Sequence, residues 1–179
     1  MIKKILIGLV IVIVIFVVFV ALQPSHYRVE RSATMNAPAP VVFAQVNDFH
    51  KWNAWSPWAK LDPGMKQTFE GAPAGTGAVY KWAGNSEVGE GQMTIKESHA
   101  SDLIKIKLDF LKPFAATSDT VFTFTPEGNQ TKVTWTMDGE KNFIAKAFHL
   151  FMNIDKMVGG DFEKGLAQMK TVAESAPKP

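Results

Sequence analysis

Three titratable side chains in this sequence could transfer a proton to or from a bound molecule: Tyr80, Asp161 and His50. A phenol, a carboxylate or an imidazole acts as a general acid or base when the ligand is held against it in one geometry. Asp161 also has a structural interpretation, as a solvated helix residue or a local cap beside Gly159-Gly160. That interpretation is favoured, because a buried carboxylate without a partner is costly. Whether the protein is an enzyme therefore stays open.

Other familiar kinds of catalytic or cofactor site have no support in the sequence. The four histidines, at positions 26, 50, 99 and 149, lack the spacing of a metal site, and there is no cysteine. No G-x-S-x-G motif is present. Gly71, Gly75 and Gly77 do not precede a predicted helix, so they indicate a hairpin loop and not a dinucleotide cradle. We therefore expect no metal and no cofactor.

The residues with most capacity to bind a ligand are large and mostly aromatic, in a chain with five Trp and thirteen Phe. They could line an apolar cavity, and as a set they suit a flat or chain-like lipophilic ligand. Each of them alone could equally fill an ordinary close-packed core. The candidate ligand-binding residues are Trp52, Trp55, Trp58, Phe69, Tyr80, Trp82, Met93, Phe110, Phe122, Trp135, Met157 and Phe162.

Trp52, Trp55 and Trp58 recur at every third position, in a stretch where Pro57 prevents a regular helix interior. They could form an aromatic rim at the mouth of a cavity or against a bilayer, where tryptophan is favoured. They could also form a plug that closes one end of a sheet. The sequence leaves both interpretations open.

The elements that must position these residues follow from hydrophobic periodicity. Residues 65–138 alternate with period two, as in Ile104, Ile106, Leu108 and Phe110, which predicts an antiparallel meander of about six strands. A strand over 27–35 and a short helix over 41–46 precede it. After Gly139 an apolar stripe of helical period runs to position 172, and Gly159-Gly160 is expected to bend or split that helix.

Residues 5–22 form an apolar run that follows Lys3 and Lys4. Eighteen residues cover about 27 Å as a helix, enough for a transmembrane anchor. A cleavable signal peptide is the alternative, but the run is long for a signal core, and Phe19 would stand three positions before a cut after Ala21. The two lysines predict a cytoplasmic N-terminus, which places the C-terminal domain on the outer side of the cytoplasmic membrane.

The expected organisation is an anchor over 1–24, one domain over 25–174 and a disordered tail over 175–179. Beyond the anchor, 19 − 2 = 17 basic residues balance 17 acidic ones, so the domain has no basic excess that would indicate nucleic-acid binding. The membrane, through residues 5–22, is the partner that the sequence does predict.

Several segments resemble the polyketide cyclase/dehydrase branch of the START-like (SRPBCC) superfamily, over about residues 27–174. They are 42–49 (VFAQVNDF), 52–58 (WNAWSPW), 77–82 (GAVYKW), 89–91 (GEG), 108–110 (LDF), 133–135 (VTW) and 159–166. The resemblance implies an α+β helix-grip fold, in which a curved antiparallel sheet wraps around a long C-terminal helix. It is weak for activity, because fold does not fix function.

On this basis we expect a membrane-tethered domain that binds a hydrophobic small molecule or lipid in an apolar cavity between the sheet and the C-terminal helix. A polyketide cyclase/dehydratase-type enzyme is one alternative. A protein-interaction scaffold with a filled core, for an unknown protein partner, is the other.

Overall fold

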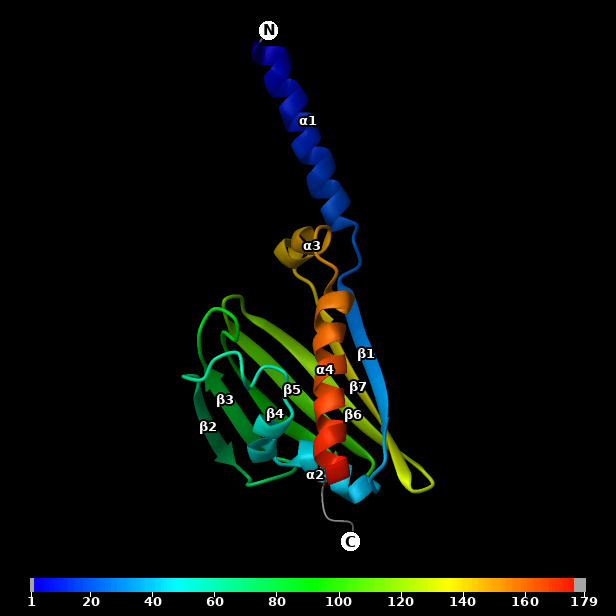
Figure 1. Ribbon diagram of the computed structural model, residues 1–179. Helices are drawn as coiled ribbons and strands as arrows, with labels where there is room; N and C mark the ends of the chain where they lie inside the picture. Colours follow the sequence, from blue (N-terminus) through cyan, green and yellow to red (C-terminus); the bar gives the residue numbers. More distant parts are fainter. Residues whose placement is uncertain (1, 176–179) are drawn as a thin grey trace.

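The computed structural model describes residues 2–175, which form one seven-stranded antiparallel sheet, a long C-terminal helix and a projecting N-terminal helix (Figure 1). In chain order the elements are α1 (Ile2–Ala21), β1 (His26–Met35), α2 (Ala39–Asn47), the 3-10 helix η1 (Phe49–Ala54), β2 (Lys66–Gly71), β3 (Ala78–Ala83), β4 (Glu90–His99), β5 (Leu103–Lys112), β6 (Ala116–Glu127), β7 (Gln130–Glu140), α3 (Phe143–His149) and α4 (Ile154–Ser175).

The sheet has the strand order β1-β7-β6-β5-β4-β3-β2, so the meander is sequential and the first strand closes against the last. Alternation sets which side chains face inward. In β7, Val133, Trp135 and Met137 are buried, and the pairing of Trp135 with Phe122 brings the inward residues of β6 beside them. The predicted α+β class, the six-stranded meander and the helix-grip arrangement are confirmed.

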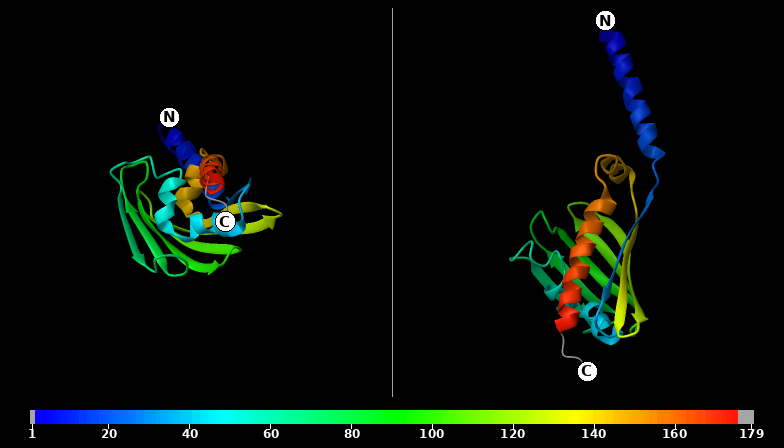
Figure 2. Two further views of the ribbon diagram at one scale, coloured as in Figure 1. Left: turned by 60° about the horizontal axis from the view of Figure 1, so that its bottom comes forward. Right: turned by 45° about the vertical axis from the view of Figure 1, so that its right-hand side comes forward.

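Helix α4 lies across the concave side of the sheet and contacts β1 more than any other strand (Figures 1 and 2). Its buried stripe comprises Phe162, Leu166, Met169 and Ala173. The expectation that Met157 faces inward is wrong, because its side chain is 49% exposed. It lies one residue, about 100° of helix rotation, away from Val158, which packs on the core.

The expectation that Gly159-Gly160 bends or splits the C-terminal helix is also wrong. Both glycines lie within α4, and the chain breaks earlier, between α3 and α4 at residues 150–153. Asparagine side chains mark the two helix starts: Asn142 accepts a hydrogen bond from Ala145 N, and Asn153 accepts one from Lys156 N. Gly159 remains helical and is buried by tertiary packing.

Helix α1 extends away from the sheet, with nearly all of its side chains exposed (Figure 2). Its 20 residues make it long and apolar enough to cross a membrane, and it could equally be a signal sequence. It leaves the domain at the end where α3 lies, opposite α2 (Figure 1). Ser175 is the last residue of α4, and the rest of the predicted tail, 176–179, lies outside the described residues.

Candidate ligand-binding site

A pocket of about 480 Å³ lies where α1 joins the domain. It is a partly open hollow whose wall is more polar than apolar, so it resembles a surface groove more than an enclosed cavity. Its walls come from the linker after α1, the start of β1, the end of β7, α3, the α3–α4 connection and the start of α4. The lining residues are Gln23, Tyr27, Arg28, Val29, Lys141, Lys146, His149, Leu150, Phe151, Met152, Asn153, Ile154 and Asp155.

Tyr27 is a half-buried aromatic residue in the wall of this pocket. Its hydroxyl lies 2.9 Å from Ser118 Oγ, and its ring meets His149 edge-on with centroids 6.2 Å apart. The ring covers Gly139, its partner on β7, where an added Cβ would lie 2.6 Å from the hydroxyl oxygen. Burial, with a contribution from the charge of Lys141, lowers the pKa of His149, so its imidazole is neutral at pH 7.

The pocket wall carries several cationic side chains, which differ in how firmly hydrogen bonds hold them in place. Arg28 is held by 2.8 Å hydrogen bonds to Glu30 and Asp138. Lys146 Nζ donates to the carbonyl of Ala21, the last residue of α1, at 3.2 Å. Residues 141–152 contain two lysines and no acidic residue. This part of the wall is therefore positively charged.

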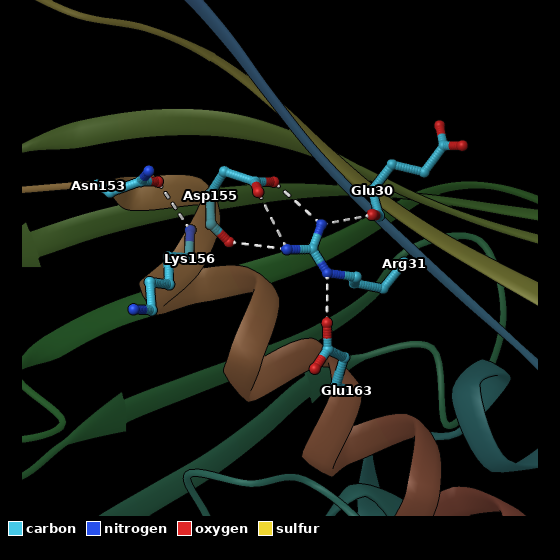
Figure 3. Close-up of polar contacts among 6 residues, drawn as sticks. All are labelled: Glu30, Arg31, Asn153, Asp155, Lys156 and Glu163. Carbon is cyan, nitrogen blue, oxygen red and sulfur yellow. Dashed lines mark hydrogen bonds and ion pairs between the residues drawn. The ribbon is translucent and has the colours of Figure 1, made fainter.

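A polar clamp fixes the start of α4, one wall of the pocket, against β1 (Figure 3). Arg31 Nε donates to Glu163 at 2.7 Å, and its Nη1 and Nη2 donate to the Asp155 carboxylate at 3.0 and 3.1 Å. The Asp155 partner, followed by Glu163, raises the pKa of Arg31, and the same hydrogen bonding lowers the pKa of Asp155. The clamp passes beside Gly159, where a Cβ would overlap the Arg31 guanidinium.

The structure brings most of the predicted lining residues into one aromatic network, but part of that network is tightly packed. Trp135 and Phe162 stack with ring centroids 3.8 Å apart, and Phe122 stacks on Trp135 at 4.8 Å. Gly165 of α4 lies so close that a Cβ would be 3.0 Å from the Trp135 ring. At this point the space between sheet and helix is occupied by the protein's own side chains.

The network continues along β2 to β5, where α4 does not cover the sheet (Figure 1). Ring centroids are 5.3 Å apart for Phe69 and Tyr80, 5.9 Å for Tyr80 and Trp82, and 6.1 Å for Trp82 and Phe110. Phe69, Trp82 and Phe110 are half-buried, whereas Met93, the partner of Tyr80 in the ladder, is buried. These strands therefore present an apolar inner surface that is less enclosed than the part beneath α4.

Two polar atoms on the inner face of the sheet are buried without a hydrogen-bond partner among the described residues: Thr120 Oγ1 and Trp135 Nε1. Thr120 faces Met137 across β6 and β7, and Trp135 is the next inward residue along β7. Buried polar atoms are normally paired, so each of these has hydrogen-bonding capacity to offer to a polar group of a ligand or to water.

The tryptophan triplet belongs to the core at the far end of the domain. Trp52 and Trp55 are 5% and 0% exposed, and their indole nitrogens donate at 3.0 Å to the carbonyls of Val46 and Gln45. Trp58 is half-buried against Trp135 and Phe162. The interpretation as a rim against a bilayer is wrong for Trp52 and Trp55, because η1 lies toward α2, away from α1 (Figure 1).

No hydrogen bond or ion pair joins any two of the three candidates for proton transfer among residues 2–175, although the ring of Phe69 contacts both His50 and Tyr80. His50 is exposed, pairs with Asp48 at 2.8 Å and stacks on Phe69. Burial raises the pKa of Tyr80 to about 12, so its phenol stays protonated at neutral pH. Asp161 pairs with Lys164 on the same helix at 3.1 Å. Among residues 2–175, no three His, Asp or Glu side chains are placed to hold a metal ion.

The sequence did not identify the pocket beside α1, because its walls are scattered along the chain. Tyr27 on β1 and His149 on α3 are separated by more than a hundred positions and meet only through the pairing of β1 with β7. One signal was available: the stretch 141–152 combines lysines with many large apolar residues and lacks acidic ones.

Comparison with known proteins gives a family and a set of related folds. The family described as polyketide cyclase/dehydrase and lipid transport matches residues 26–174. No curated protein matches the chain in sequence. Among solved structures, a protein from Thermobifida fusca is 22% identical, with a TM-score of 0.61, covering 82% of this chain and 92% of that one.

Two further structures have similar folds. CV1439 from Chromobacterium violaceum is 14% identical, with a TM-score of 0.60, covering 86% of this chain and 100% of that one. DynU16, a protein of the dynemicin biosynthetic locus, is 15% identical, with a TM-score of 0.57, covering 83% of this chain and 47% of that one. At these identities the likeness concerns the fold.

Proposed function

We propose that this chain is a membrane-tethered domain that binds a hydrophobic small molecule or lipid. It belongs to the polyketide cyclase/dehydrase and lipid transport family, which supports this proposal. The observation that carries the proposal is the position of the 480 Å³ pocket beside the end of α1. Gln23, two residues beyond α1, is part of its wall. A lipid leaving the bilayer beside α1 would reach this pocket with little exposure of its apolar chain to water.

The tether in this proposal is α1. Twenty helical residues span about 30 Å, the thickness of a bilayer's hydrocarbon core. Its side chains are almost all exposed, which in water would be unfavourable for so apolar a helix. Lys3 and Lys4 favour a cytoplasmic N-terminus, and the domain then lies on the outer side of the cytoplasmic membrane. The units proposed are the anchor over 1–24 and the domain over 25–174.

The inner face of β2 to β5 is proposed as a second contact for an apolar ligand. Phe69, Trp82 and Phe110 are half-buried there and supply aromatic surface. Thr120 Oγ1, on the neighbouring strand β6, is buried without a partner among the described residues and supplies a hydrogen-bonding atom on the same face of the sheet. A ligand with a long apolar body and one polar group would match this arrangement.

Bound lipid can be measured directly on the full chain purified in a mild detergent, by native mass spectrometry and by extraction of co-purifying lipids. Leu150, which lines the pocket, is replaced by Trp to fill it. The matched control is Leu61→Trp, at an exposed leucine remote from the pocket. We expect the wild type and the control to carry lipid and Leu150→Trp to lose most of it. A wild type that carries none, or equal amounts in both variants, would contradict the proposal.

The orientation is tested separately with a reporter enzyme fused to the C-terminus. A reporter active only outside the cytoplasm, such as a periplasmic phosphatase, should be active in the fusion. An inactive phosphatase, together with activity of a cytoplasmic reporter at the same position, would place the domain on the inner side.

A further inference from the structure

The large apolar side chains that are exposed outside α1 gather at one end of the domain. Ten such residues occur between positions 22 and 175, and Leu61 is the one that lies elsewhere. The other nine belong to the linker after α1, the end of β5, the β5–β6 turn, α3, the α3–α4 connection and the first turn of α4. They are Leu22, Leu111, Phe114, Phe143, Ile144, Phe148, Phe151, Met152 and Met157.

Several of these residues lie close together, although they come from separate parts of the chain. Phe114 of the β5–β6 turn lies 6.3 Å, between ring centroids, from Phe148 of α3. Helix α3 in turn contacts α1, and Lys146 donates to the carbonyl at the end of α1. Figures 1 and 2 show α3 directly beside the point where α1 leaves the domain. We call residues 111–114 together with 141–152 the apical surface.

The charges on the apical surface have one sign. Lys141 and Lys146 lie in the segment 141–152, which has no acidic residue. Lys112 is the last residue of β5 and pairs with Glu90 at 2.6 Å. Within the apical surface itself every charged side chain is a lysine, and Glu90, which pairs with Lys112, and the exposed Glu140 lie at its border. Exposed Phe, Ile and Met beside lysines is the composition of segments that lie in the interface of an anionic bilayer. Aromatic side chains are favoured at the same depth.

We infer that the apical surface is a second membrane contact, docking on the anionic surface of the bilayer that α1 spans. The inference rests on the proposed membrane tether. The end of α1 fixes the apical surface next to the headgroup region, and insertion would remove its phenylalanine rings from water. Docking would also hold the pocket beside α1, which Phe151 and Met152 line, against the lipids from which its ligand is drawn.

The natural chain has no cysteine, so single labels can be placed on the full-length protein. Phe148→Cys and the control Leu61→Cys replace side chains that are 52% and 43% exposed, so neither change disturbs the core. Each is labelled with the environment-sensitive fluorophore NBD and reconstituted in vesicles of phosphatidylcholine with or without phosphatidylglycerol. Quenching by lipids that carry a doxyl group near the headgroup then reports contact with the bilayer.

We expect the label at 148 to shift to the blue and to be quenched by the doxyl lipid, more so with phosphatidylglycerol, and the label at 61 to stay in water. Vesicles that carry the protein but quench both labels equally weakly would overturn the docking and leave the tether standing. A blue shift at 148 that depends on protein concentration and not on doxyl lipid would assign the surface to a second copy instead. Protein that fails to float with the vesicles would overturn the tether itself.

Discussion

Replacing Gly159 with alanine tests whether the Arg31 clamp holds α4 in place. Both Gly159 and its neighbour Gly160 are interior residues of α4, so helix propensity alone predicts that either alanine stabilises the protein. The structure distinguishes them. A Cβ at 160 would meet no atom within 4 Å, whereas a Cβ at 159 would overlap the Arg31 guanidinium.

The expected difference in stability between the two variants follows from that contrast. Alanine is favoured over glycine in a helix interior by about 0.8–1.0 kcal/mol, which should raise the melting temperature of Gly160→Ala by about 2–4 °C. At 159 the same gain is opposed, because the guanidinium must leave its hydrogen bonds to Asp155 and Glu163 to make room. We expect Gly159→Ala to melt at or below the wild type, so that the two variants differ by at least about 1 kcal/mol.

The assay is thermal unfolding of the full chain in detergent, followed by circular dichroism, for the two single variants and for each in an Arg31→Ala background. Removing the guanidinium removes the obstacle, so Gly159→Ala should become stabilising in that background, as Gly160→Ala is in both. The reasoning is refuted if Gly159→Ala alone stabilises the protein as much as Gly160→Ala does. It is also refuted if the Arg31→Ala background makes no difference to it.

Three further outcomes are expected from the same unfolding assay. Thr120→Val should stabilise the ligand-free protein by about 1 kcal/mol, because Thr120 Oγ1 is buried without a partner among the described residues. Thr131→Val should destabilise the protein by a similar amount, because the Thr131 hydroxyl donates to a backbone carbonyl at 2.8 Å. Equal changes in the free energy of unfolding for the two variants would contradict this. Phe162→Ala should lower the free energy of unfolding by about 3–5 kcal/mol, because the Phe162 ring is buried against Trp135. Met157→Ala should leave it almost unchanged, because Met157 is exposed. A large loss of stability in Met157→Ala would show that Met157 is part of the core. Burial and a nearby lysine lower the pKa of His149 in the folded state, so the unfolded chain binds the proton more tightly and stability falls as pH drops through about 6.5. His149→Gln should lose less stability than the wild type between about pH 7.5 and 5.5, and identical pH profiles would contradict the assignment.

The sheet was predictable because strand alternation is a local property. Ile104 and Ile106, or Val133 and Trp135, are two positions apart and must share a face whatever the rest of the chain does. The turns were marked by glycine, proline and asparagine between the apolar runs. These signals together define six consecutive strands, and a meander needs no long-range information to assemble.

The two errors in the C-terminal region came from tertiary contacts. Helix propensity predicts a bend or break at Gly159-Gly160, yet α4 continues through both residues, and a glycine is required at 159 because Arg31 of β1 occupies the space where a side chain would be. Met157 was expected to face inward with the apolar stripe, yet it points outward. The type of an apolar residue in a helix does not reveal whether its side chain faces the core or the solvent.

By itself the sequence determined the apolar N-terminal helix, the strand faces and the C-terminal helix, because each depends on residues close together in the chain. Tyr80, His50 and Asp161 are plausible acids or bases by type, and only the fold places His50 and Tyr80 on either side of Phe69 and pairs Asp161 with Lys164. The pocket beside α1 was decided by tertiary structure alone. Gln23, Tyr27 and His149 lie at opposite ends of the sequence, and the pairing of β1 with β7 brings them together. Such pairing depends on which strand edges remain free after the meander has formed, and no local pattern in the sequence records it.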